Sequence, residues 1–314
     1  MRICFSGMMG NYLRRRGKIV CSEKQHDAMM KFVSALIMSN PTAGTDVVSI
    51  TFSKDRAMQL HALLRSYREN VAHRGVMYVL YKATDERQKR SYVELQSIFN
   101  DAGYVFIEEV DFRMQLIKLC ENAEAGKILF YVDDMMFTHN LDYDAVRKID
   151  TSRYILALTR GRDLTYSTVL QKPLVIPKFY EKVDGFESFK WNETSEISDW
   201  TFPLGVSGYM FGRSEAAAML KSVNFKAPNS LEAGMQLFLP LFMNRIGLCT
   251  ENAICTCVPA NLVQSEWTNL NLGTFSTDEL LSLWEAGKMI DCQEFYGKPV
   301  YVTQTQKYTF IDRL

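Results

Sequence analysis

Two adjacent carboxylates, Asp133 and Asp134, interrupt an otherwise apolar part of the chain. They follow Ile128 to Val132 (Ile-Leu-Phe-Tyr-Val), which has the β-branched and aromatic composition of a buried strand, and apolar residues resume at Met135. Neighbouring ionised groups repel each other, so a site that keeps both charged normally supplies a cation. Carboxylates together with phosphate oxygens suit Mg²⁺ or Mn²⁺. A solvated turn at the end of a strand, where Asp is common, explains the dipeptide equally well.

A second polar cluster, Thr51-Phe52-Ser53-Lys54-Asp55-Arg56, follows the apolar start of another expected strand. At the beginning of a helix, its backbone N–H groups and the helix dipole would attract a phosphate. Phe52 would offer a base a flat face, and the hydroxyls of Thr51 and Ser53 would reach a ribose. Ser53 is also compatible with a simple helix N-cap. The segment lacks the glycine patterns of dinucleotide folds and P-loops, which argues against dehydrogenases and P-loop NTPases.

Strand and helix patterns alternate around these clusters. The expected strands cover 47–52, 76–81, 104–107 and 128–132, and the expected helices cover 55–70, 85–100 and 111–123. Such alternation is typical of βαβ units in a mostly parallel sheet. Ligands of open α/β sheets collect at the carboxyl ends of the strands, where both polar clusters fall. The acidic pair therefore ends the fourth expected strand, at the end where such ligands bind.

The first 45 residues are expected to form a separate extension. A helix is predicted over 22–39 because apolar residues recur there with the spacing of one helix face. The segment 40–44 (Asn-Pro-Thr-Ala-Gly) then ends it, so we divide the chain into 1–45 and 46–314. The basic residues Arg14, Arg15, Arg16 and Lys18, with apolar neighbours, could rest on an anionic membrane surface or be a solvated extension.

The overall composition narrows the possible partners. The 36 basic and 36 acidic residues balance, which argues against wholesale nucleic-acid binding. Seven cysteines without framework spacing indicate thiols in a reducing compartment, and Cys255-Thr-Cys257 lacks the spacing of a zinc site. There is no apolar stretch of the roughly 18 residues needed to span a bilayer. We therefore expect a cytoplasmic protein that could also lie peripherally at the inner face of the membrane.

Together these residues resemble the nucleotide-diphospho-sugar glycosyltransferases of the GT-A fold, particularly the inverting family 2-like enzymes, over about Asp46 to Ile290. The resemblance implies an α/β fold with a doubly wound, mixed but mostly parallel sheet flanked by helices. It implies that Thr51, Phe52, Ser53 and Arg56 surround a uridine. It further implies that Asp134 holds Mn²⁺ or Mg²⁺ bridging the donor pyrophosphate, while Asp133 contacts the ribose or the water shell of the metal.

Two downstream segments extend the resemblance. Residues 199–211 (Asp-Trp-Thr-Phe-Pro-Leu-Gly-Val-Ser-Gly-Tyr-Met-Phe) resemble the stretch that lines the donor-sugar pocket, with Ser207 and Gly208 among its contacts. A packed β-turn beside a core Trp is the alternative. Residues 227–234 resemble the acidic element that deprotonates the acceptor hydroxyl, which makes Glu232 the general base. The alternative is a stabilising charge at a helix N-terminus.

The chain departs from the family at the second strand. The sequence Leu80-Tyr81-Lys82-Ala83-Thr84-Asp85 lacks the usual base-reading carboxylate. Tyr81 or Lys82 could replace its contacts, which leaves the preference for uracil over guanine open. Ala233 follows Glu232, so a second carboxylate beside the expected base is also absent.

Three functions remain open. The first is a metal-dependent glycosyltransferase that moves a sugar from a nucleotide donor, expected to be UDP-linked, to a glycan or other hydroxyl acceptor. The second is a non-catalytic nucleotide-sugar binding or scaffold protein. The third, a sugar nucleotidyltransferase, would need a glycine-rich loop where residues 52–56 have no glycine.

His139 is a further candidate metal ligand, and Lys298 or Lys307 could close over the diphosphate or be surface lysines. His26, His61 and His73 have no acidic partner nearby in sequence, so no role is expected for them.

Overall fold

The computed structural model describes residues 22–39, 44–194, 196–263, 273–305 and 307–313. The basic segment Arg14 to Lys18 lies outside these residues, as does most of the Asn40 to Gly44 boundary. Among the described helices, none is both long and apolar enough to cross a membrane.

The described residues contain one large sheet of nine strands, in the order β11-β12-β14-β8-β13-β5-β1-β3-β4. The strands are β1 (Val47–Lys54), β3 (Met77–Lys82), β4 (Tyr104–Glu108), β5 (Lys127–Val132), β8 (Tyr154–Gly161), β11 (Lys182–Val183), β12 (Phe186–Lys190), β13 (Tyr209–Gly212) and β14 (Ile246–Thr250). β1 pairs in parallel with β3 and β5, and β3 pairs in parallel with β4. β13 runs antiparallel between β5 and β8, and β12 antiparallel to β14. The predicted mixed, mostly parallel sheet is confirmed.

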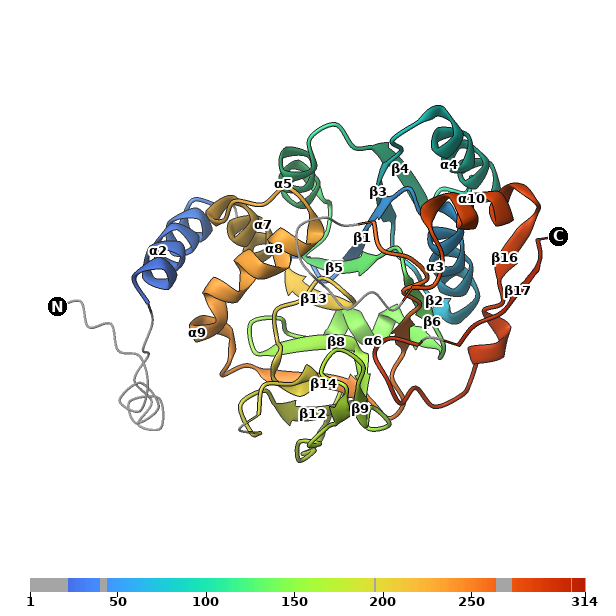
Figure 1. The fold of residues 1–314 in the computed structure, drawn as a ribbon. Coiled ribbons are helices and arrows are strands. Elements are labelled where there is room, and N and C mark those ends of the chain that lie inside the picture. The colour runs from blue at the N-terminus through green and yellow to red at the C-terminus, as the bar shows by residue number, and fades with distance from the viewer. Residues whose placement is uncertain (1–21, 40–43, 195, 264–272, 306, 314) are drawn as a thin grey trace.

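Helices cover both faces of the sheet, and each face has its own apolar core (Figure 1). One face carries α3 (Ala57–Asn70), α4 (Glu86–Ile98), α6 (Tyr143–Lys148) and α10 (Thr277–Glu285); the other carries α2 (Glu23–Ile37), α5 (Phe112–Asn122), α7 (Arg213–Ser222), α8 (Pro228–Met235) and α9 (Leu239–Phe242). Side chains of a strand alternate between faces. In β1, Ile50 and Phe52 join the core beneath α5, whereas Ser49 and Ser53 face Tyr143 of α6 and Tyr92 of α4.

Shorter elements complete the chain. They are β2 (Val71–Ala72), β6 (Met135–Phe137), β7 (Leu141–Asp142), β9 (Tyr166–Ser167), β10 (Lys172–Pro173), β15 (Cys255–Cys257), β16 (Lys288–Ile290), β17 (Phe310–Asp312), η1 (Asp199–Thr201), η2 (Gln236–Phe238) and η3 (Gln293–Phe295). All four strands and three helices expected between residues 47 and 132 are present, with ends displaced by a few residues. The predicted N-terminal helix is also present as α2, and Ser22 forms a capping box with Gln25 at its start.

Helix α2 packs against α7 and η2, although it lies inside the expected extension. Its buried residues are Ala28, Met29 and Phe32. The ring of Phe32 lies 5.3 Å from that of Phe238 and 6.1 Å from that of Phe242, measured between centroids. The division at residue 45 stays a prediction, and α2 shares the core of the domain that follows it.

Replacing Phe32 by Ala tests this packing. We expect Phe32→Ala to lower the free energy of unfolding by about 3–5 kcal/mol, because it empties a buried aromatic site. Val33→Ala, on the exposed side of α2, should change it by less than about 0.5 kcal/mol. Chemical denaturation measures both. An equally small change for the two variants would show that α2 does not unfold together with the domain.

Candidate active site

A cleft of about 600 Å³ opens at the carboxyl ends of the central strands. Residues predicted from the sequence that line it are Phe52, Ser53, Arg56, Asp133, Asp134, Ser207 and Glu232. They come from the end of β1, the turn after β5, the segment before β13 and helix α8. The fold therefore gathers four segments that are far apart in the chain around one cleft.

The acidic pair forms the turn between β5 and β6. The backbone N–H of Asp133 donates to the carbonyl of Phe52 at 3.2 Å, which extends the β1–β5 pairing by one residue. Nη1 of Arg56 lies 3.0 Å from Oδ1 of Asp133 and 3.3 Å from Oδ2 of Asp134. Asp133 is only 5% exposed. The pair, with Asp133 buried and Asp134 half-buried, is therefore an ion-paired feature of the cleft and not a solvated turn.

Arg56 is held in place by Asn261. Its Nε donates to Oδ1 of Asn261 at 2.9 Å, and its Nη2 donates to the Asn261 backbone carbonyl. Nε2 of Gln59 donates to the same Oδ1 at 2.7 Å, so Asn261 is itself fixed by α3. Four acceptors thus surround one guanidinium, and its orientation toward the carboxylates is set before any ligand arrives. Asn261 is 205 residues from Arg56, and no sequence pattern indicated it.

Ser53 does not act as an N-cap. Helix α3 begins at Ala57 with Arg56 as its N-cap residue, and no side chain caps it. Ser53 is still in β1, where its Oγ lies 2.7 Å from the hydroxyl of Tyr92. The backbone N–H of Arg56 donates to the same hydroxyl at 3.2 Å. Tyr92 therefore ties the end of β1 to the start of α3, and the N-cap alternative is wrong.

The electrostatics of the pair favour a cation. Burial raises the pKa of Asp133 to about 6, the charge of Arg56 acts against this rise, and the charge of Asp134 adds to it. When both carboxylates are ionised, their two negative charges exceed the single positive charge of Arg56. The three groups together then carry one net negative charge. Asp134 keeps 17% of its side chain exposed toward the cleft. Oxygen ligands with this charge fit Mg²⁺ or Mn²⁺, with Asp134 as the more accessible ligand.

The histidine and the two lysines that the sequence suggested as further site residues do not line the cleft. Nδ1 of His139 is 3.1 Å from the Ala253 carbonyl, and His139 is not among the residues that line the cleft. Lys298 and Lys307 are exposed and do not line it either. The lysines that do are Lys54, Lys82 and Lys226.

A separate cluster on the surface has the spacing of a metal site. In the part of the chain that the structure describes, His73, Asp142 and Asp144 are the one group of three such side chains close enough to share an ion. Nδ1 of His73 lies 2.9 Å from Asp142 and 3.4 Å from Asp144. His73 has no acidic residue near it in the sequence, but the fold brings these two close to it. All three are exposed, and none lines the cleft.

Three predicted contact residues are absent from the lining of the cleft. Thr51 is fully buried within β1, and its Oγ1 has no hydrogen-bond partner among the described residues. The ring of Tyr81 stacks on Tyr92 with centroids 4.6 Å apart. Gly208 has φ of 79° and donates its N–H to the carbonyl of Phe130 at 2.8 Å, a backbone conformation that other residues rarely adopt. None of the three is a lining residue.

Glu232 lies in the second turn of α8 and does not open it. The helix starts at Pro228, and its first turn contains no acidic residue, so the reading of Glu232 as a helix N-terminal charge is wrong. Oε1 of Glu232 accepts a hydrogen bond from the backbone N–H of Val206 at 3.1 Å. Burial raises the pKa of Glu232, while the Val206 N–H and the charge of Arg160 lower it. Glu232 is half-buried, and a carboxylate with a raised pKa is suited to general-base chemistry.

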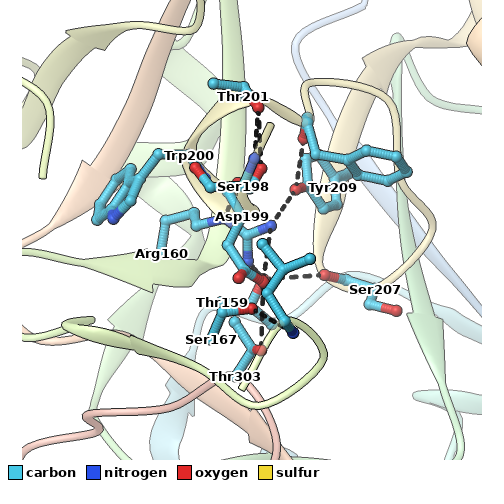
Figure 2. A network of polar contacts seen from close by, with 12 residues as sticks. Thr159, Arg160, Ser167, Ser198, Asp199, Trp200, Thr201, Ser207, Tyr209 and Thr303 are labelled. Carbon is cyan, nitrogen blue, oxygen red and sulfur yellow. Dashed lines mark hydrogen bonds and ion pairs between the residues drawn. The ribbon is translucent and has the colours of Figure 1, made fainter. Parts of the chain in front are cut away.

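A network of polar contacts, shown in Figure 2, surrounds Arg160 next to this part of the chain. Arg160 donates from Nε to the Asp199 carbonyl at 2.8 Å, from Nη1 to Thr159 Oγ1 at 3.0 Å and from Nη2 to the Tyr209 hydroxyl at 2.9 Å. Thr159 Oγ1 donates to the Ser207 carbonyl at 3.4 Å. The network fastens the segment before β13 to β8. Trp200 of that segment and Tyr209, the first residue of β13, are buried and do not line the cleft. For Trp200 this agrees with the alternative of a packed turn beside a core Trp.

The cleft also contains residues that the sequence reasoning missed. Besides Asn261 they include Glu109, Phe112, Asn229, Cys257 and Gln304. Glu109 directly follows β4, so the rule that ligands bind at strand ends could have found it. We call the part of the cleft lined by Phe52, Lys82, Glu109 and Phe112 the strand-end pocket. The cysteines in the described residues are buried, unpaired thiols, as expected.

The raised pKa of Asp133 makes cation binding depend on pH. Mn²⁺ competes with a proton at Asp133, so its affinity should fall about tenfold between about pH 7.5 and about pH 5. Titration calorimetry of the wild type and of Asp134→Asn measures this, and the substitution should abolish the binding. Asp144→Asn, in the exposed His73 cluster, is the control. If it removes Mn²⁺ binding and Asp134→Asn does not, the metal binds at the surface cluster.

Comparisons with known proteins find matches of low similarity. No protein-family profile matches the chain. A curated relative, the bifunctional glycosyltransferase pgtA of Dictyostelium discoideum, is 22% identical over 192 residues, which cover 55% of this chain and 25% of that protein. The chain thus spans about a quarter of the length of this relative.

Two solved structures are similar in part. TarS of S. aureus has a TM-score of 0.43 and 16% identity, covering 68% of this chain and 37% of that one. The mannosyltransferase PcManGT of Pyrobaculum calidifontis, solved with GDP-Man and Mn²⁺, has a TM-score of 0.30 and 12% identity, covering 45% of each chain. The mixed sheet flanked by helices is consistent with a GT-A-like α/β fold, and the curated relative that the chain resembles is a glycosyltransferase.

Proposed function

We propose that the chain is a metal-dependent glycosyltransferase that moves a sugar from a nucleoside-diphosphate donor to an acceptor hydroxyl. One observation carries the proposal: the same cleft is lined by a carboxylate pair suited to a divalent cation and by Glu232, a half-buried carboxylate with a raised pKa. Transfer from such a donor needs both, because charge develops on the leaving diphosphate while a proton leaves the acceptor.

At the donor side, Asp134 and Asp133 would hold Mn²⁺ or Mg²⁺. When bound, the metal neutralises charge on the departing diphosphate. Arg56 keeps the two carboxylates together, and Lys54 and Lys226 add positive charge along the cleft. The resemblance to family 2-like enzymes favours a UDP-linked donor.

At the acceptor side, Glu232 acts as the general base of a single displacement. The acceptor oxygen forms a bond to the anomeric carbon as the bond from that carbon to the diphosphate breaks. The hydroxyl proton passes to Glu232, and the nucleoside diphosphate leaves. The Val206 N–H fixes one carboxylate oxygen, so the other stays available for the proton. This single step inverts the configuration at the anomeric carbon.

A binding or scaffold protein is the alternative function. It would use the same cleft for a nucleotide sugar but would release no free nucleoside diphosphate. The identity of the acceptor as a glycan or another hydroxyl compound, the cytoplasmic location and the membrane contact through the basic segment stay predictions.

A panel of nucleotide sugars with Mn²⁺ tests the proposal. Wild type should be thermally stabilised by its donor and should release nucleoside diphosphate slowly, even without acceptor. Asp134→Ala should lose both effects. Glu232→Gln should keep donor binding and lose transfer by about 100-fold or more, since it removes the base alone. Glu124→Gln, on the surface outside the cleft, should behave as wild type. Donor binding without any release of diphosphate would favour the scaffold protein.

The pH dependence of transfer tests the role of Glu232 separately. The base must be ionised, so the rate should fall as the pH drops through the raised pKa of Glu232. Arg160→Met removes a charge that lowers this pKa, so the acid side of the profile should move to higher pH. Arg160→Lys keeps the charge and should move it much less. Identical profiles for wild type and Arg160→Met would exclude Glu232 as the titrating base.

A further inference from the structure

The strand-end pocket contains a charged pair that the proposed chemistry does not use. Lys82 is the last residue of β3, and Glu109 directly follows the neighbouring strand β4. Nζ of Lys82 lies 3.1 Å from Oε1 of Glu109, and both side chains line the cleft. Glu109 is largely shielded from solvent, with 16% of its side chain exposed. A carboxylate is thus present at this end of the cleft. It follows β4, whereas the family resemblance leads one to expect it after β3.

The turn that carries Lys82 is fixed by Asp55. The backbone N–H of Asp55 donates to the Lys82 carbonyl at 3.1 Å. The Asp55 carboxylate in turn accepts from the N–H of Thr84 at 2.8 Å and from its hydroxyl at 3.0 Å. The exit of β3 is therefore bound, at Lys82 and at Thr84, to the polar turn that follows β1.

The turn that carries Glu109 is fixed by Gln115. Oε1 of Gln115 accepts from the N–H groups of Val110 and Asp111 at 2.8 and 2.9 Å, and its Nε2 donates to the Glu108 carbonyl at 2.9 Å. The Glu109 N–H donates to the Tyr81 carbonyl at 2.6 Å, which continues the β3–β4 pairing. Because both backbones are held, little ordering is needed when a ligand meets this pair, as expected of a recognition site.

The chemistry of the pair distinguishes the bases. A carboxylate only accepts hydrogen bonds and can use both oxygens, while an ammonium only donates. Guanine presents two adjacent N–H donors, at N1 and N2, beside the acceptor O6. Uracil presents one N–H between two carbonyls, and adenine presents one amino group beside a ring nitrogen acceptor. Only guanine offers a donor to each oxygen of Glu109 together with an acceptor for Lys82. The rings of Phe52 and Phe112, 5.2 Å apart, give this pocket an apolar wall.

We propose that Glu109 and Lys82 select guanine, so that the donor is a GDP-linked sugar and not the UDP-linked sugar that the resemblance favours. This rests on the proposed function, since it assumes that a nucleoside diphosphate occupies the cleft. Glu109 accepts from N1–H and the N2 amino group, and Lys82 donates to O6.

Four diphosphates with Mg²⁺ test the base preference by calorimetry: GDP, IDP, XDP and UDP. Wild type should bind GDP about tenfold or more tighter than UDP or XDP. IDP lacks the N2 amino group and should lie between. In Glu109→Gln the side chain gains an N–H donor. This donor can bond to the C2 oxygen of xanthine but not to the C2 amino group of guanine, so the variant should bind XDP more tightly than GDP. Glu108→Gln, an exposed neighbour that does not line the cleft, should keep the wild-type order.

The outcomes separate this inference from the proposed function. If wild type binds UDP as tightly as GDP, or if correctly folded Glu109→Gln weakens all four diphosphates equally, guanine selection is overturned while the glycosyltransferase proposal stands. If none of the four binds to wild type, both are overturned. Thermal unfolding of each variant without nucleotide shows whether it is folded.

Discussion

The cleft depends on one guanidinium shared by two carboxylates and an asparagine. Arg56 donates to Asp133, Asp134 and Asn261, which belong to the turn after β5 and to a segment more than 200 residues away. In a buried setting, breaking such a charge pair by removing one partner typically costs about 3–5 kcal/mol, because the other charge is left uncompensated. The interaction therefore holds the acidic pair in place and joins the C-terminal part of the chain to the strand ends.

This arrangement is possible because β1 lies between β3 and β5 in the sheet. Parallel pairing aligns their carboxyl ends, so the residues after each strand meet at one edge. The antiparallel strand β13 follows the segment that contains Ser207 and brings it to the same edge. Helix α8 then contributes Glu232, whose carboxylate binds the backbone of that segment. The carboxylate pair, Ser207 and Glu232 thus share one cleft because the order of the strands in the sheet brings their segments to one edge.

The sequence was sufficient to predict site residues that lie at or directly after the end of a strand. Asp133, Asp134, Phe52 and Arg56 could be identified because a run of apolar residues marks each strand and polar residues mark its end. Periodicity could not say which of these side chains face the cleft. Thr51 and Tyr81 have the right place in the chain, yet Thr51 is fully buried in β1 and Tyr81 stacks on Tyr92, so neither lines the cleft.

By itself, the sequence determined the alternation of strands and helices, the edge of the sheet that carries polar groups, and the resemblance to GT-A glycosyltransferases. Hydrophobic periodicity and turn residues act over a few positions, and a single chain displays them directly. Only the tertiary structure decided that Asn261 fixes Arg56, that Arg160 lies behind Ser207 and Glu232, and that Glu109 of one strand pairs with Lys82 of the next. These contacts join residues 27 to 205 positions apart, and their partners are set by how strands and helices pack together.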